Sequence, residues 1–296
     1  MRVLEPRLTR VSDARSGFTL IELLVALVIF GIMAGSVMNV IIRSQRSSLA
    51  QAQRLDMQQN LRAAAVVMPS ELRSLDAAEG DIKAMSANSI TIRAMRQLAI
   101  VCTAPVMGPP LTGKLITVRT PIYSASRNFI VGDSILLWYE GDAHTRTDDG
   151  WLLGRVTAIA NQNCTDGTAG QRITVDLAAI VAPKVNQAGA VPNGAPLRGF
   201  ETITYSSGAA ADGRWYLNLQ DANGTTPLLG PLTGASGVAF TYYDAAGNVT
   251  AVPTQVAQIG LTIREQSVDM INKGSTSAFA GDSIVTRIAL RNNPRF

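Results

Sequence analysis

The sequence predicts an α+β protein, in which a long N-terminal α-helix precedes a globular head made mostly of antiparallel β-sheet. Residues 18–42 are apolar except for Glu22, Asn39 and small residues. Residues 43–78 contain no glycine and place apolar side chains at helical spacing. From Gly80 onward, short β-type runs alternate with turns rich in Gly, Asn, Asp and Pro. A helical stem followed by a β-rich head accounts for all three observations.

The apolar run is long enough to cross a membrane. At about 1.5 Å per residue, residues 18–42 exceed the roughly 30 Å hydrocarbon core of a bilayer. Gly31 and Gly35 lie four positions apart in this run and permit close packing against another helix. Glu22 lies inside the hydrophobic edge, where an ionisable group is costly and usually has a function.

Residues 17–22, Gly-Phe-Thr-Leu-Ile-Glu, indicate what that function is. They resemble the type III signal of type IV prepilins and pseudopilins at every position. The resemblance implies that a prepilin peptidase cuts after Gly17 and removes residues 1–17 as a leader. It also implies that the new terminus at Phe18 is N-methylated and that Glu22 guides the subunit into a filament.

The chemistry of these residues agrees with that role. Cleavage would leave an ammonium group at Phe18, one helical turn from Glu22, and opposite charges attract strongly in a low-dielectric setting. Between neighbouring chains the same attraction would favour one axial stagger. Two alternatives remain: an ordinary membrane anchor, and a secretory signal peptide with a small-residue cleavage site at residues 34–36. Glu22 within the apolar region and the long polar leader speak against the signal peptide.

The helix is predicted to continue as an amphipathic half over residues 43–79. Its apolar positions include Leu49, Leu55, Leu61, Met68, Leu72 and Leu75. Pro69 predicts a kink or a restart of the helix. Type IVa major pilins usually carry a helix-bending proline where this chain has Asn39. That departure favours a minor component over the main filament subunit.

The remaining residues, 80–296, are predicted to form the β-rich head. The expected strands are 89–94, 98–102, 115–119, 129–139, 151–159, 172–177, 200–206, 214–219, 237–243, 255–264 and 283–291. The segment 183–199 is interpreted as a long loop or a seam between two lobes. Residues 221–224 and 244–248 are typical of hairpin turns, with calcium loops as the alternative.

Three C-terminal stretches, residues 237–248, 263–264 and 286–292, resemble the carboxy-terminal part of PilW-type minor pilins. The J-type pseudopilins of type II secretion share the stem-plus-sheet plan. The resemblance implies a minor pilin of type IV pilus assembly, anchored once in the bacterial inner membrane with its head in the periplasm, and later part of the pilus at the cell surface. Implied partners are the prepilin peptidase, the major pilin and other minor pilins, the inner-membrane assembly platform and the lipid bilayer. The alternatives are a type II secretion pseudopilin and an exported adhesin or DNA-uptake pilin.

Composition and motifs favour a structural protein over an enzyme. The chain contains neither a P-loop nor a GxSxG motif, and no cofactor is expected. The single histidine, His144, lies in a polar loop with Asp142, Asp148 and Asp149. A solvated loop is favoured there over a metal cluster. The formal charge of +4 is spread along the chain without a basic arm, which argues against a nucleic-acid partner.

Cys102 and Cys164 are the only cysteines. If the head leaves the cytoplasm it enters an oxidising compartment, where a disulfide between them is favoured. Such a bond would close a long loop and stabilise the head by about 4 kcal/mol. Two separate buried thiols remain the alternative, because nothing in the sequence fixes the distance between them.

Overall fold

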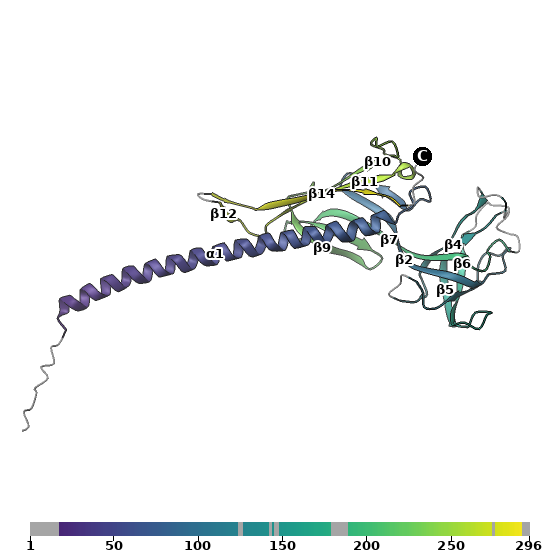
Figure 1. Ribbon diagram of the computed structural model, residues 1–296, viewed down its shortest axis with the longest axis horizontal. Coiled ribbons are helices and arrows are strands. Elements are labelled where there is room, and N and C mark those ends of the chain that lie inside the picture. The colour runs from purple at the N-terminus through teal and green to yellow at the C-terminus, as the bar shows by residue number, and fades with distance from the viewer. Residues whose placement is uncertain are drawn as a thin grey trace, which may run out of the picture. The chain divides into compact units, whose positions relative to one another are not determined.

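The computed structural model describes residues 18–123, 127–141, 144, 148–178, 189–273 and 276–291. The chain divides into two units, residues 1–53 and residues 54–296. One helix, α1 (Leu20–Arg73), precedes a series of β-strands, and the predicted α+β class is confirmed (Figure 1). Among the described residues, α1 is the one helix long and apolar enough to cross a membrane.

Helix α1 runs through Pro69 and ends at Arg73, so the helix does not restart at Pro69, which was one of two alternatives there, and the predicted end near residue 79 is wrong. The end is set by a turn in which the Ser74 N–H donates to the Glu71 carbonyl at 3.2 Å. Asp81 then accepts a hydrogen bond from the Asp76 N–H at 2.9 Å, and Gly80 has a φ of 75°. A carboxylate that accepts from the backbone and a glycine in the left-handed region both favour a turn over further helix.

The second half of α1 is amphipathic, but its buried stripe differs in part from the predicted one. Met57, Leu61, Met68 and Leu72 are buried, whereas Leu49 and Leu55 are 65% and 57% exposed. The buried side chains follow one another at spacings of four or seven residues, which keeps them on one helix face. This face supplies the helical part of a hydrophobic core.

The head consists of β1 (Ile82–Met85), β2 (Ser89–Thr103), β3 (Lys114–Arg119), β4 (Ser134–Tyr139), β5 (Gly150–Asn161), β6 (Gly170–Leu177), β7 (Pro196–Ala209), β8 (Trp215–Asp221), β9 (Gly224–Leu232), β10 (Val238–Tyr243), β11 (Gln258–Gln266), β12 (Ile271–Lys273), β13 (Thr276–Ala278) and β14 (Gly281–Ala289). Within the described residues, a 12-stranded sheet has the order β1-β2-β3-β6-β5-β4-β7-β8-β9-β11-β10, with β14 paired to β11. A short 3₁₀-helix, Pro253–Gln255, precedes β11, and β12 and β13 form a separate hairpin. The strand pairs are antiparallel, as the predicted fold class requires.

Several strand predictions are corrected. The two strands expected at 89–94 and 98–102 are one strand, β2, and β7 begins at Pro196, inside the segment interpreted as a loop. Residues 129–133 form a turn, because Gly132 has a φ of 98° and Asp133 accepts from the Ile130 N–H at 3.0 Å. Strand β9 was not expected, since Pro227 and Pro231 cannot donate to a sheet. It tolerates them because β8 pairs along its length on one side, while β11 meets it only at Leu232.

The two predicted hairpin turns have different outcomes. The turn at 221–224 is confirmed: Asp221 pairs with Gly224 at the end of β8 and β9. The Asp221 Oδ1 accepts from the Asn223 and Gly224 N–H groups at 2.7 and 3.1 Å. At 244–248 the Asp244 N–H donates to the Asn248 carbonyl at 2.9 Å, next to a bridge between Tyr243 and Val249. This second turn follows β10, but no strand begins at its far end.

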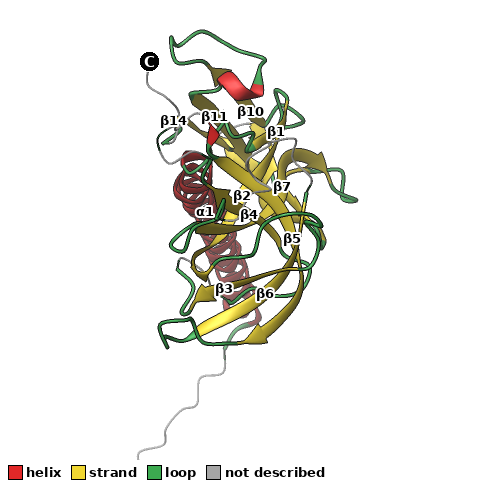
Figure 2. Ribbon diagram, turned by 90° about the vertical axis from the view of Figure 1, so that its right-hand side faces the viewer, coloured by secondary structure: helices red, strands yellow, loops and turns green. Residues whose placement is uncertain are grey.

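Residues 54–296 contain two hydrophobic cores. The first, the helix core, combines Leu61, Met68 and Leu72 of α1 with buried side chains of β1, β2, β7–β11 and β14. The second, the strand core, takes its buried side chains from β2–β7 and neighbouring loops, with no helical residue among those described. Strands β2 and β7 contribute to both cores, with Ile92 and Ile203 in the helix core and Val101 and Leu197 in the strand core. The long β2–β7 ladder therefore connects the two cores. Both strands are labelled in Figures 1 and 2.

A bulge marks the point where the ladder passes from one core to the other. Met95 pairs with Phe200 and Gln97 with Gly199, so Arg96 is the extra residue of β2. Its guanidinium donates to Glu71 of α1 at 2.7 Å and to Glu201 of β7 at 3.0 Å. The bulge thereby joins the end of α1 to both long strands.

Candidate functional site

The first turn of α1 is closed by a reciprocal pair of hydrogen bonds between Thr19 and Glu22. The Thr19 N–H and hydroxyl both donate to Glu22 Oε2 at 3.0 Å, and the Glu22 N–H donates to Thr19 Oγ1 at 3.3 Å. The Leu23 N–H donates to the Thr19 carbonyl at 3.2 Å, which makes Thr19 the N-cap. The arrangement is a capping box, in which two otherwise unsatisfied N–H groups at the helix start gain partners.

Sequence reasoning missed this cap, although its Thr-x-x-Glu signal is present at residues 19–22. Both bonds to the carboxylate end on Oε2, so Oε1 is available for another partner. Glu22 shares a solvent-facing surface of the helix with Ile21, Val25, Ala26 and Ile29. A carboxylate within an apolar helix face can accept a hydrogen bond from a cation on another helix that packs there.

Other predicted N-terminal residues lie in open positions or outside the described chain. Phe18 is 88% exposed. Gly31 and Gly35 have nothing within 4 Å of an added Cβ, so their proposed close packing concerns another molecule. Gly17 lies outside the described residues, and so does the rest of the leader.

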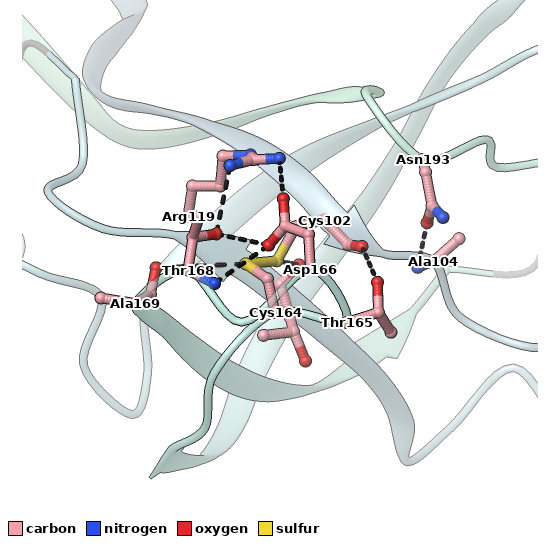
Figure 3. Close-up of a disulfide and its surroundings, with 10 residues drawn as sticks. Cys102, Ala104, Arg119, Cys164, Thr165, Asp166, Thr168, Ala169 and Asn193 are labelled. Carbon is pink, nitrogen blue, oxygen red and sulfur yellow. Dashed lines mark hydrogen bonds and ion pairs between the residues drawn. A yellow bond between two sulfur atoms is a disulfide. The ribbon is translucent and has the colours of Figure 1, made fainter.

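The predicted disulfide is confirmed. Cys102 of β2 and Cys164 of the β5–β6 connection are bonded, with their Cα atoms 5.5 Å apart (Figure 3). The bond closes a loop with a sequence separation of 62 residues, for which the chain-entropy estimate gives about 4 kcal/mol of stabilisation. It joins the end of β2 to a turn beside the strand core.

The turn that carries Cys164 is held by its own polar groups. The Cys164 N–H donates to the Thr168 carbonyl at 2.8 Å, and the Gly167 N–H donates to the Cys164 carbonyl at 2.9 Å. Asp166 accepts from the Thr168 hydroxyl at 2.6 Å and forms an ion pair with Arg119 of β3, as Figure 3 shows. These contacts stabilise the turn that carries Cys164, so the region around the disulfide has a structural role.

The polar loop around His144 forms no metal site among the described residues, where no group of three or more His, Cys, Asp or Glu side chains is arranged to hold an ion. Asp142 lies outside the described residues. The Asp149 Oδ1 accepts from the Gly141 N–H at 3.0 Å, which is a loop contact.

Comparison with known proteins places the N-terminal segment in a family. Residues 13–38 match the prokaryotic N-terminal methylation motif. This motif, which covers residues 13–38 of the 296, is the N-terminal motif of the type IV pilin and pseudopilin superfamily, whose members are typically structural and non-enzymatic. It indicates processing by a prepilin peptidase and is consistent with a pilin anchored in the inner membrane. No curated protein and no solved structure shows significant similarity to the chain.

Proposed function

We propose that this chain, a type IV pilin-like protein by its N-terminal motif, is a minor pilin that takes part in the assembly and initiation of type IV pili. The observation that carries the minor role is Asn39, which stands where major pilins of the type IVa class usually have proline. Helix α1 runs without interruption through this position. The C-terminal resemblance to PilW-type minor pilins supports the same assignment.

The capping box suggests how Glu22 acts in assembly. Cleavage after Gly17 and methylation of Phe18 leave a cationic amino group one residue before Thr19. Glu22 keeps its own helix start closed through Oε2, while Oε1 receives the terminal ammonium of a neighbouring subunit. Such a charge-assisted hydrogen bond is strong in an apolar setting, and its geometry sets the axial stagger of the two stems. Gly31 and Gly35 allow the neighbouring helix to approach closely.

Two substitutions separate the charge of Glu22 from its capping role. Glu22→Gln keeps a side-chain oxygen for Thr19 but removes the charge, whereas Thr19→Ala removes the cap and keeps the charge. We expect the processed Glu22→Gln protein to be depleted from sheared pili relative to the membrane pool, and the Thr19→Ala protein to be retained. Equal recovery of Glu22→Gln and parent would reject the assembly role. Mass analysis of the mature N-terminus should find methylated Phe18, and a start at Val37 would indicate signal-peptide cleavage instead.

A type II secretion pseudopilin of the J type is the second candidate, favoured by the stem-plus-sheet architecture of the chain. Deletion of the gene separates the two. Loss of surface pili with normal secretion of exoproteins supports the minor pilin. Normal piliation with impaired secretion would instead indicate that the chain is a pseudopilin of the type II secretion system. An exported adhesin or DNA-uptake pilin would instead leave pili present and abolish surface binding or DNA uptake.

A further inference from the structure

A cationic groove lies on the sheet where the two cores of the head meet. It has a volume of about 540 Å³ and receives residues from β1, β2 and β4–β7. Its basic side chains are Lys83 of β1, Arg93 of β2 and Arg155 of β5, and its one carboxylate is Asp176 of β6. The excess of positive charge favours an anionic ligand.

Strand register explains why these side chains share one face. Arg155 is opposite Asp176 on β6 and opposite Ser134 on β4, and Ser134 is in turn opposite Phe200 on β7. Thr202, two residues beyond Phe200, is opposite Arg93 of β2. Directly opposed residues of antiparallel strands, and residues two apart on one strand, project from the same face. Strand register therefore places Arg93 and Arg155 on one face, whereas Lys83 lies at an irregularity of the β1–β2 ladder between Ile82 and Ala84.

The cations differ in how far they are already neutralised. Arg93 is buried, forms an ion pair with Asp81 at 3.4 Å and lies 5.1 Å from the centre of the Phe200 ring. Its Nε has no hydrogen-bond partner. Lys83 and Arg155 form no hydrogen bond or ion pair with the described residues. Burial, and then the charge of Arg93, lower the pKa of Lys83, while the carboxylate of Asp81 acts in the opposite direction. Asp81 is already paired with Arg93, so Lys83 has no counter-ion of its own among the described residues.

Asp176 does not supply that counter-ion. Its Oδ1 accepts from the Gly113 N–H at 2.8 Å, and it lies in no ion pair with Arg155 within the described part of the chain. A carboxylate brought by a ligand would complete the charge balance around Lys83 and Arg155.

The other residues that line the groove indicate which class of ligand would bring the carboxylate. The exposed side chains of Leu153 and Ala178 give the groove aliphatic walls, Leu177 at its edge is buried in the strand core, and the described lining contains no Asn or Gln. The Phe200 ring is 9% exposed and has Arg93 over it. Sugars are usually bound by exposed aromatic faces and amide side chains, so these walls fit the apolar side chains of a peptide better.

We propose that this groove binds an acidic segment of a partner polypeptide, with a Glu or Asp carboxylate held by Lys83 and Arg155 and neighbouring aliphatic side chains against Leu153 and Ala178. The site lies in the head and is independent of the N-terminal segment. It would remain whether the chain serves a pilus or a secretion system.

The test uses the full chain in detergent micelles and a fluorescent peptide of alternating glutamate and valine. Its controls are the same peptide with glutamine in place of glutamate and an oligogalacturonate, all at one ionic strength. We expect the acidic peptide to bind at least about tenfold more tightly than its glutamine analogue, a difference of roughly 1.4 kcal/mol. The double substitution Lys83→Glu and Arg155→Glu should abolish this preference.

Arg172→Glu is the control, because it reverses one positive charge on β6 outside the groove, as each half of the double substitution does inside it. It should leave peptide binding unchanged. Lys83 and Arg155 are exposed, so the double variant should unfold at the same denaturant midpoint as the parent. Equal affinity for the two peptides, equal loss with Arg172→Glu, or tight binding of the oligogalacturonate alone would each overturn the proposal, the last in favour of an acidic glycan.

Discussion

The two cores of the head are closed in different ways. The helix core is completed by one face of α1, whose Leu61, Met68 and Leu72 are buried among strand residues. The strand core has no helix over it among the described residues and lies beside the disulfide between Cys102 and Cys164. A helix contributes buried apolar area, whereas a disulfide contributes mainly by restricting the unfolded chain. The comparison shows one sheet stabilised by packing on one part and by a covalent link on another.

The tryptophans allow the two cores to be observed separately. Trp215 packs against the helix core. Trp138 packs against the strand core and meets Trp151 edge to face, with ring centroids 5.2 Å apart. The chain contains three tryptophans, so replacing Trp215 by Phe leaves only strand-core fluorescence, and replacing Trp138 and Trp151 leaves only helix-core fluorescence. Each prediction below is measured by urea unfolding of both reporter proteins.

The largest effect is expected from removal of the disulfide. Cys102→Ser with Cys164→Ser should lower the free energy of unfolding seen by Trp138 and Trp151 by about 4 kcal/mol, because the unfolded chain is no longer restricted. Trp215 should report a smaller loss, transmitted through β2 and β7. An equal loss at both reporters would mean that the two cores unfold as one cooperative unit.

Next in size is truncation in the helix core. Leu72 of α1 is fully buried, and Leu72→Ala should cost about 3 kcal/mol through lost burial and the cavity that remains. The loss should appear at Trp215, the reporter of the helix core, at a lower urea concentration than at Trp138 and Trp151. Leu55→Ala is the matched control on the same helix, because Leu55 is 57% exposed and its truncation should leave both reporters within error. A comparable loss from Leu55→Ala would contradict the buried stripe described for α1.

The contrast between these two leucines shows what the sequence could predict. The helix, its membrane-length apolar half and the general run of strands follow from periodicity and turn residues. Which apolar positions are buried does not follow, because Leu55 and Leu61 look alike in sequence and differ only in what packs on them. The same holds for β9, whose prolines oppose a strand locally but are tolerated where a second neighbour is nearly absent.

The candidate functional residues also differ in how far the sequence could predict them. The roles predicted for Gly17, Phe18 and Glu22 rest on a contiguous motif, which a sequence displays directly. The Cys102–Cys164 bond could be favoured from the cysteine count, but the distance that permits it depends on β2 and the β5–β6 connection. The groove at Lys83, Arg93 and Arg155 could not be predicted, because it depends on the register of β2 and β5–β7 and on an irregularity of the β1–β2 ladder at Lys83.

A third prediction concerns Glu265, which is fully buried in β11. Burial raises its pKa to about 7, with Asp282 of β14 adding to the shift, while Asn60 of α1 and the Gly230 N–H act in the opposite direction. The Asn60 side-chain amide donates to its Oε1 at 3.4 Å, and Oε2 has no hydrogen-bond partner among the described residues. A raised folded-state pKa means that stability is greatest below pH 4.5 and falls as pH rises to about 7.

Glu265→Gln should therefore stabilise the helix core above pH 7 by on the order of 2 kcal/mol and lose this advantage near pH 4.5. Trp215 fluorescence across this pH range measures it. A pH-independent gain from Glu265→Gln would show that its carboxyl group does not titrate differently in the folded protein.

The smallest effect tests how α1 is held at its end. The Tyr205 hydroxyl of β7 donates to Glu71 Oε2 at 2.5 Å, while Glu71 Oε1 accepts from Arg96. Burial, and then this hydrogen bond, raise the pKa of Tyr205 above its usual range, so the phenol stays protonated and remains a donor. Tyr205→Phe should cost about 1 kcal/mol, because Arg96 still satisfies Glu71 and the ring still fills its place in the core. Tyr216→Phe makes the same change where the hydroxyl meets Asp212 at the surface, and it should leave the midpoint unchanged. If both variants behaved alike at Trp215, the contact between Tyr205 and α1 would contribute nothing to closing the helix core, and apolar packing alone would distinguish this core from the one beside the disulfide.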